Sequence, residues 1–237
     1  MTLGGTNTYV VGEAPAYVID PGPAEPSHCE AVQAAGAERG GIAGILLTHS
    51  HSDHSAAVPM LAAPLLFGEV GAGDETSGGS GEEGLSARAP RVGPFEVVAT
   101  PGHAGDHVCF RFGGVGFCGD LVLGQGSSFV PPDGGSLIAY LDSLERLGTA
   151  DFELLCPGHG PYVTDPRAKV EEYIEHRLER ERKLLEALRR GERSRARLLD
   201  AAWDDVPAQM RPAAAVVMQA HLDKLQAEGR LPGDLTS

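Results

Sequence analysis

The chain has 237 residues, of which 42% are hydrophobic and 22% charged, as in an ordinary globular protein with one large domain or one domain plus a small appendage. No run approaches the roughly 18 apolar residues of a membrane span, and we see no signal peptide, so we expect no membrane contact. The net charge of −14 falls on residues 1–160, which hold 5 basic and 19 acidic side chains; residues 161–237 hold 14 of each. The acidic front part repels phosphate backbones unless bound metal ions reverse its field.

Short β-type segments separated by Gly- and Pro-rich turns fill the first 160 residues and predict sheets with helices between strands. The predicted strands are 8–11, 16–19, 44–48, 64–67, 95–99, 107–112, 115–118 and 153–156. The predicted helices are about 29–37, 54–62 and 136–147. Residues 71–84 have almost no apolar content and predict a flexible loop, either a surface insertion or a binding lid.

The character of the chain changes at Pro166, where a long helix is predicted over 169–190 and closed by Gly191. Its apolar positions are Val170, Ile174, Leu178, Leu184, Leu185 and Leu188. Shorter helices are predicted at about 194–203, 207–210 and 213–227. We therefore expect a catalytic domain over 1–163 and a small helical subdomain over 164–237.

Four cysteines are scattered along the chain without paired spacing: Cys29, Cys109, Cys118 and Cys156. We interpret them as small buried hydrophobic residues of a protein in the reducing cytoplasm rather than as disulfides.

The most informative segment is 48–54, where His49, His51, Asp53 and His54 follow an apolar run. Imidazole and carboxylate groups suit zinc and its first-row neighbours. Four candidate ligands within six residues therefore predict a metal site.

Three further ligand candidates, His103, Asp120 and His159, each follow a predicted strand and stand next to a glycine. Loops at strand ends bring side chains of a sheet scaffold together, and glycine allows the backbone to approach a metal closely. Each signal is weak alone, but all seven candidates in one chain form a strong pattern.

These motifs resemble those of the metallo-β-lactamase fold hydrolases over roughly residues 3–163. The pattern His-x-His-x-Asp-His at 49–54, followed by the three later ligands, is highly specific for that family. The resemblance implies an α+β fold, an αββα sandwich, with Asp20 orienting the ligand loop through hydrogen bonds.

Carried over by position, the resemblance implies two metal ions. His49, His51 and His103 would hold one ion, and Asp53, His54 and His159 the other, with Asp120 bridging them. We expect two Zn²⁺ per chain, with manganese or iron as alternatives. Two such ions activate a bridging hydroxide and stabilise the negative charge that develops during attack, while Asp53 orients the hydroxide or handles its proton.

The N-terminal pattern at 2–9, the segment around His176 and Arg177, and the ending at 221–229 narrow the resemblance to the β-lactamase-like protein 2 subgroup. The ending is similar to the recognition helix of a winged-helix module. Animal members of that subgroup are endoribonucleases, and fungal relatives are thioesterases acting on acyl-carrier protein. His176 and Arg177 either bind substrate in the metal cleft or face solvent on a charged helix.

Three histidines have other expected roles. We expect His28 and His221 at the surface or within helices, and His107 beside a ligand that it supports.

We predict an enzyme that hydrolyses an ester, thioester or lactone of a small or carrier-bound acyl substrate. The acidic catalytic domain and its few aromatic residues favour this interpretation, because single-stranded nucleic acid normally requires basic grooves and stacking rings. The alternative is a metal-dependent endoribonuclease acting on single-stranded RNA, favoured by nine basic against four acidic side chains over 177–197. The oligomeric state is not readable from the sequence.

Overall fold

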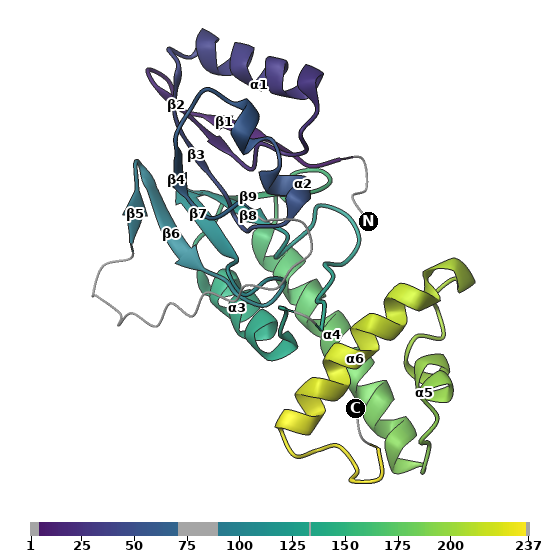
Figure 1. Ribbon diagram of the computed structural model, residues 1–237. Coiled ribbons are helices and arrows are strands. Elements are labelled where there is room, and N and C mark those ends of the chain that lie inside the picture. The colour runs from purple at the N-terminus through teal and green to yellow at the C-terminus, as the bar shows by residue number, and fades with distance from the viewer. Residues whose placement is uncertain (1–4, 71–89, 133, 236–237) are drawn as a thin grey trace.

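The computed structural model describes residues 5–70, 90–132 and 134–235, so the predicted loop at 71–84 lies outside the described residues (Figure 1). The first sheet contains β1 (Tyr9–Val11), β2 (Ala16–Ile19), β3 (Ile42–Leu46) and β4 (Leu65–Phe67), side by side in chain order. Strand β1 is antiparallel to β2, and the other two pairs are parallel. Strands β2 and β3 therefore end at the same edge.

The second sheet contains five strands, also adjacent in chain order. They are β5 (Arg91–Val92), β6 (Phe95–Ala99), β7 (Val108–Phe112), β8 (Val115–Gly119) and β9 (Leu154–Pro157). All pairs are antiparallel except β8 with β9, which are parallel. Strand β5 was not predicted because two residues are too few to show an alternating pattern.

The two sheets face each other across a core that both supply with apolar side chains. Ile19 and Leu46 come from the first sheet, and Phe95, Phe110 and Phe117 come from the second. The Phe95 ring meets the Phe110 and Phe117 rings edge-on, an arrangement that aromatic pairs prefer. This shared core fixes how the strand ends of the two sheets are placed relative to each other.

Helices cover the outer face of each sheet, which gives the predicted order of helix, sheet, sheet and helix (Figure 1). Helix α1 (Pro26–Glu38) packs Cys29 and Val32 on the first sheet, and α3 (Leu137–Thr149) packs on the second. All four cysteines are free and buried, as predicted.

The helix predicted over 54–62 is wrong in its extent. The structure has a single turn, α2 (Ser52–Ser55), and then a 3₁₀ turn over Val58–Met60. Pro59 has no backbone N–H to donate, so the α-helical hydrogen bonds do not continue through it.

Helix α4 (Pro166–Arg189) belongs to both parts of the molecule. Its N-cap residue Asp165 accepts a hydrogen bond from the Ala168 N–H at 3.0 Å. Tyr173 packs in the core beneath the second sheet, whereas Leu184 and Leu188 pack in the core of the C-terminal subdomain. A boundary at residue 163 therefore does not separate two independent cores.

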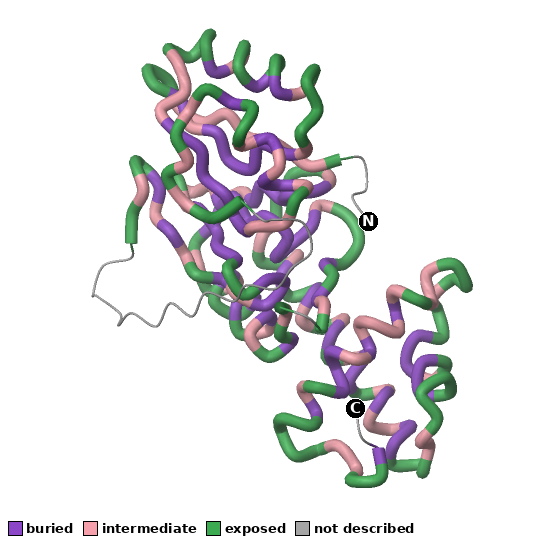
Figure 2. The backbone as a smooth tube through the Cα atoms, in the orientation of Figure 1, coloured by how far each residue is buried: buried purple, intermediate pink, exposed green. Residues whose placement is uncertain are grey.

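The C-terminal subdomain consists of the second half of α4 with α5 (Arg195–Ala202), a 3₁₀ turn (Ala208–Met210) and α6 (Arg211–Ala227). Its buried positions are purple in Figure 2. Trp203, Met218 and Leu222 belong to its hydrophobic core. None of the helices in the described residues is long and apolar enough to cross a membrane.

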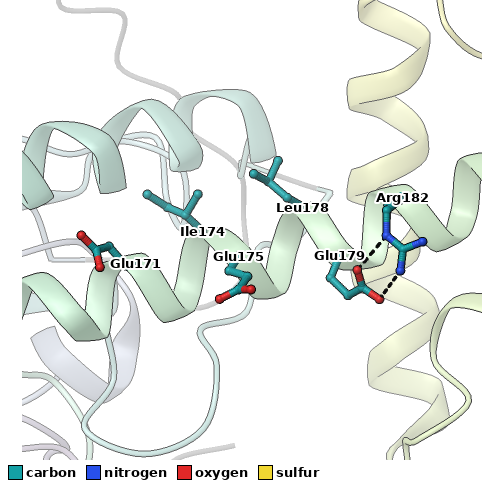
Figure 3. Close-up of a pocket in the computed structure, with 6 residues that line it drawn as sticks. All are labelled: Glu171, Ile174, Glu175, Leu178, Glu179 and Arg182. Atoms are coloured by element: carbon teal, nitrogen blue, oxygen red, sulfur yellow. Dashed lines mark hydrogen bonds and ion pairs between the residues drawn. The ribbon is translucent and has the colours of Figure 1, made fainter.

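One of the apolar positions on α4 is exposed. Leu178 is 50% exposed, and with Ile174 it lines a shallow hollow of about 440 Å³ whose other walls are charged (Figure 3). Arg182, at one end of this hollow, is ion-paired with Glu179 and Glu186. None of the predicted metal ligands lines the hollow.

Candidate metal centre

The predicted ligands follow strands that end at one edge of the sandwich. His49 follows β3 of the first sheet, whereas His103, Asp120 and His159 follow β6, β8 and β9 of the second. Asp53 lies on α2, just after β3. Because the common core holds both sheets, residues up to 110 positions apart in the chain converge at this edge.

The structure brings together the three imidazoles of the first group that the resemblance implied. His51 Nδ1 lies 3.0 Å from His49 Nε2 and 3.0 Å from His103 Nε2. A tetrahedral zinc ion with Zn–N bonds of about 2.0–2.1 Å holds its ligand nitrogens roughly 3.3 Å apart. The spacing of these nitrogens therefore suits one small cation among them.

The second group contains Asp53, His54 and His159. Asp53 Oδ2 lies 3.3 Å from His159 Nε2 and 3.9 Å from His54 Nε2. The ligand atoms of these three residues all lie within 4.8 Å of one another. This spacing also suits one cation.

Asp120 lies between the two groups. Its Oδ1 is 3.5 Å from His54 Nε2, and its Oδ2 is 3.7 Å from His103 Nε2 and 3.5 Å from His159 Nε2. One carboxylate therefore approaches histidines of both groups, which is the geometry that a bridging ligand requires.

Four of the five histidines have their Nδ1 atoms occupied on the side away from the centre. His103 Nδ1 donates to Phe129 O at 2.6 Å, and His159 Nδ1 donates to Gly5 O at 2.9 Å. His54 Nδ1 lies 3.0 Å from Asp20 Oδ2, and His49 Nδ1 lies 3.0 Å from Thr48 Oγ1. An imidazole held through Nδ1–H presents its Nε2 lone pair to a metal.

Asp20 orients the first-sheet ligands, as the resemblance implied. Its carboxylate accepts from the Thr48 N–H at 2.8 Å and from the Thr48 hydroxyl at 2.7 Å. The Thr48 oxygen is then free to accept from His49. Asp20 thus fixes His54 directly and His49 through Thr48.

His107 supports a ligand without belonging to either group, as predicted. Its Nε2 accepts from the Asp120 backbone N–H at 3.2 Å, and its Nδ1 lies 2.8 Å from Thr100 Oγ1. Complete burial, then the nearby His103, lowers the pKa of His107 to about 3, so it stays neutral and remains an acceptor.

Glycine beside a ligand serves a steric purpose at two positions. A Cβ on Gly158 would stand 2.5 Å from Asp120 Oδ1 and 2.6 Å from a ring carbon of His54. Gly102 has φ +139°, and a Cβ there would stand 2.3 Å from the Tyr140 backbone. A side chain at either position would displace the centre.

The two groups differ in charge. Burial lowers the pKa of His49 and His103, with neighbouring imidazoles adding to the effect at His49, so both are neutral and available as ligands. Burial also acts to lower the pKa of His54 and His159, but the nearby aspartates outweigh it and raise both values to about 10. Interactions with these histidines outweigh the effect of burial on Asp120 and hold its pKa well below the usual range.

Two buried polar atoms of the centre lack a hydrogen bond within the described part of the chain, and a bound metal ion would supply the missing partner. His54 Nε2 and Asp120 Oδ1 are buried and have no hydrogen-bond partner among the described residues, although they lie 3.5 Å apart. Unpaired buried polar atoms are costly, and a divalent cation bound by both would satisfy them.

The remaining predicted site residues lie on α4, away from these groups. Arg177 is only 2% exposed and donates hydrogen bonds to Ser127 Oγ and to the Ser128 carbonyl. The prediction that it binds substrate is therefore corrected, since no substrate reaches a guanidinium enclosed in this way. His176 is half-buried, and its Nε2 lies 3.3 Å from Arg180 Nε on the same helix. His28 lies on α1, and His221 lies on α6 but is fully buried rather than at the surface.

Sequence reasoning missed the backbone carbonyls of Gly5 and Phe129 and the hydroxyl of Thr48. A carbonyl has no sequence signature. Thr48 does have one, because it directly precedes the first ligand, His49.

Known proteins resemble this chain in sequence and in fold. The family model of the metallo-beta-lactamase superfamily matches residues 1–65 and 70–159, and that of the beta-lactamase associated winged helix domain matches residues 196–231. The chain is 32% identical to the beta-lactamase-like protein 2 homolog of Drosophila melanogaster, over 98% of this chain and 85% of that protein.

A fungal relative and a bacterial structure extend the comparison. The lactamase-like protein adaB of Aspergillus niger is 39% identical over 84% of this chain, which spans 62% of that protein's length. The crystal structure of a metallo-beta-lactamase family protein from Thermus thermophilus has the same fold, with a TM-score of 0.70 and 24% identity over 94% of this chain and 89% of that one. The chain therefore belongs to the metallo-β-lactamase superfamily and is a metal-dependent hydrolase of that fold.

Proposed function

We propose that the protein is a binuclear zinc hydrolase that cleaves an ester, thioester or lactone of a small or carrier-bound acyl substrate. The observation that carries the two-metal interpretation is Asp120, whose carboxylate lies 3.5–3.7 Å from histidines of both groups. Zinc suits a site of five imidazoles and two carboxylates, with manganese or iron as alternatives. Two divalent cations bound here would supply a water nucleophile that ionises near neutral pH and would stabilise the charge of the transition state.

Asp53 is the residue best placed to orient water or hold its proton. Its side chain is 34% exposed, against 13% for Asp120, so it borders the solvent. Burial acts to raise the pKa of Asp53, but His159 and His54 together outweigh it and leave the pKa below its usual value. An ionised carboxylate at the solvent boundary can accept a proton from an attacking water.

The distribution of cationic groups supports an acyl substrate. The described arginines of the catalytic domain contact groups of that domain other than the predicted metal ligands. Arg111, for example, donates to the carbonyls of Gly113 and Asp151. Phe129, whose carbonyl holds His103, is 39% exposed. Acidic ligands, an exposed phenylalanine and no arginine or lysine in contact with the ligands among the described residues favour an uncharged acyl group over a phosphate backbone.

The endoribonuclease alternative is favoured by one specific observation. Residues 189–197 of the C-terminal subdomain include Arg189, Arg190, Arg193, Arg195 and Arg197. Arg193 and Arg197 are ion-paired with Asp234 and Glu192, whereas Arg189 and Arg190 have no ion-pair partner among the described residues. This surface would attract a polyanion.

The decisive experiment compares the two substrate classes on one preparation. The zinc-loaded protein is assayed with acyl thioesters, lactones and single-stranded RNA, beside Asp53→Ala. We expect hydrolysis of at least one acyl substrate, lost in the variant. RNA cleavage that is lost in the variant and falls steeply with salt, without acyl hydrolysis, would replace this proposal with the alternative.

A further inference from the structure

Arg177 is buried on α4 without an acidic partner. It has no carboxylate within 4.0 Å among the described residues, and its Nε has no hydrogen-bond partner there. Its stabilising contacts are Ser127 Oγ at 3.1 Å, the Ser128 carbonyl, and the Tyr140 ring, whose centroid lies 5.4 Å from the guanidinium carbon. Because a buried charge is costly to desolvate, these contacts should hold the arginine and its partners firmly together.

Two of these partners lie in the segment that follows Asp120. Ser128 accepts from Arg177 through its carbonyl and donates from its hydroxyl to the Asp120 carbonyl at 2.5 Å. The next carbonyl, that of Phe129, accepts the Nδ1–H of His103. Two adjacent residues thus connect the arginine to a ligand of the first group and to the backbone of Asp120, the residue between the groups.

The same segment is held along its length by two tyrosines beneath the second sheet. Tyr140 donates to the Leu121 carbonyl at 2.7 Å. Tyr173, one turn before Arg177 on α4, accepts from the Leu123 N–H at 3.1 Å and donates to the Gly126 carbonyl at 2.8 Å. The segment from 121 to 129 therefore has α3 and α4 on one side and two metal ligands on the other.

We propose that Arg177 is a positioning residue for the metal centre, acting through Ser128 on Asp120 and through Phe129 on His103. Beyond Arg177, α4 continues into the C-terminal subdomain, where Arg180 and Leu184 are buried. Arg177 itself is thereby coupled to the ion held by His49, His51 and His103. This inference rests on the metal binding of the proposed function.

The test is metal affinity rather than turnover alone. Zinc binding to wild type, Arg177→Met and Arg177→Lys is measured by competition with a chromophoric chelator, and the cobalt-substituted proteins are compared by their visible absorption spectra. Changes in groups that orient metal ligands typically cost about 10–100-fold in affinity. We expect about tenfold weaker binding of one of two ions in Arg177→Met, an altered cobalt spectrum, and partial recovery in Arg177→Lys.

Arg182→Met is the matched control. Arg182 lies on the same helix, but its side chain is 57% exposed and paired with Glu179 in the hollow of Figure 3. The Arg182→Met protein should bind both ions with wild-type affinity. A folded Arg177→Met with wild-type affinity and spectrum, whatever its melting temperature, would overturn the proposal.

Ser128→Ala provides a second test that removes no buried charge. It removes the hydroxyl that reaches the Asp120 carbonyl and keeps the carbonyl that Arg177 uses. We expect a severalfold loss of affinity for one ion, and wild-type affinity with an unchanged cobalt spectrum would contradict the coupling. Failure of the wild type itself to bind two ions would instead refute the proposed function.

Discussion

The metal centre and the C-terminal subdomain both bury polar side chains, but they pair them differently. In the subdomain, Arg180 Nη1 lies 2.6 Å from Asp205, and the buried Glu181 lies 2.7 Å from Lys224 and 2.8 Å from Arg230. At the metal centre, the imidazole and carboxylate atoms stand 3.3–3.9 Å apart. These distances exceed the 2.7–2.9 Å typical of a charge-assisted hydrogen bond.

This difference separates a structural ion-pair network from a set of ligands. Short distances in the subdomain mean that opposite charges satisfy one another. Longer distances at the centre, with His54 Nε2 and Asp120 Oδ1 lacking a hydrogen bond among the described residues, mean that these atoms point toward positions between them. We therefore expect changes at the centre to affect metal and turnover, and changes in the subdomain to affect stability.

The largest effect should come from Asp120→Ala. Removing the carboxylate shared by both groups should weaken metal binding and lower kcat by at least about a thousandfold, since a metal contributes several kcal/mol to the transition state and each 1.36 kcal/mol is tenfold in rate. Circular dichroism should show an intact fold, and elemental analysis should show less than two zinc ions per chain. Wild-type turnover in this variant would refute the role of Asp120 as a ligand shared by both groups.

Removal of metal should have a comparably large effect. A ligand that binds only the folded state at about a thousand times its Kd stabilises that state by about 4 kcal/mol, so chelator should lower the melting temperature and abolish turnover. Added zinc should restore both. Chelator should have a much smaller effect on the melting temperature of Asp120→Ala. Wild-type protein purified without chelator and found to contain no metal would contradict the two-metal interpretation.

Side chains of the centre were predictable from the sequence, whereas their orienting partners were not. Strands β2 and β6 have the predicted bounds because their apolar runs end at clear turn residues. The ligands follow such runs in a recognisable pattern. The Gly5 and Phe129 carbonyls, by contrast, lie 154 and 26 residues from the histidines that they hold, and any residue type supplies a carbonyl.

The sequence also did not allow us to predict which side chains of α4 are buried. Arg177 and Leu178 are neighbours on α4, yet the charged residue is buried and the apolar one is half exposed. Their environments depend on how the segment after Asp120 and the C-terminal subdomain pack on this helix. The apolar pattern of one helix does not show which other segments pack on it.

His221 allows a smaller test, because it is a buried polar group of the subdomain. Both of its ring nitrogens lack a hydrogen bond among the described residues, and its ring lies edge-on to Trp203. Burial, then the charges of Arg177 and Lys224, lowers the pKa of His221 to about 3. His176 and Arg180 of α4 act in the same direction.

The sign of the pH effect follows from this lowered pKa. Between about pH 6.5 and pH 3 the unfolded chain binds a proton at His221 and the folded chain does not, so stability falls as the pH falls. The loss should be about 1.4 kcal/mol for each pH unit below about 6.5. Urea unfolding at about pH 7.5 and about pH 5.5 should show this extra loss in the wild type relative to His221→Leu. Parallel pH dependence of the two proteins would contradict it.

The smallest effect should come from Asp205→Ala. Arg180 would lose its carboxylate partner but keep the Ala202 carbonyl, and Asp205 itself is 63% exposed, so solvent screens much of the pair. We expect a loss of about 1 kcal/mol in the free energy of unfolding, with zinc content and kcat unchanged. Asp204→Ala, which breaks the more exposed pair with Lys183, should cost less and serves as the control. If Asp205→Ala instead lost zinc, the subdomain's ion pairs would be part of the metal centre, and the separation between a structural network and a ligand set would fail.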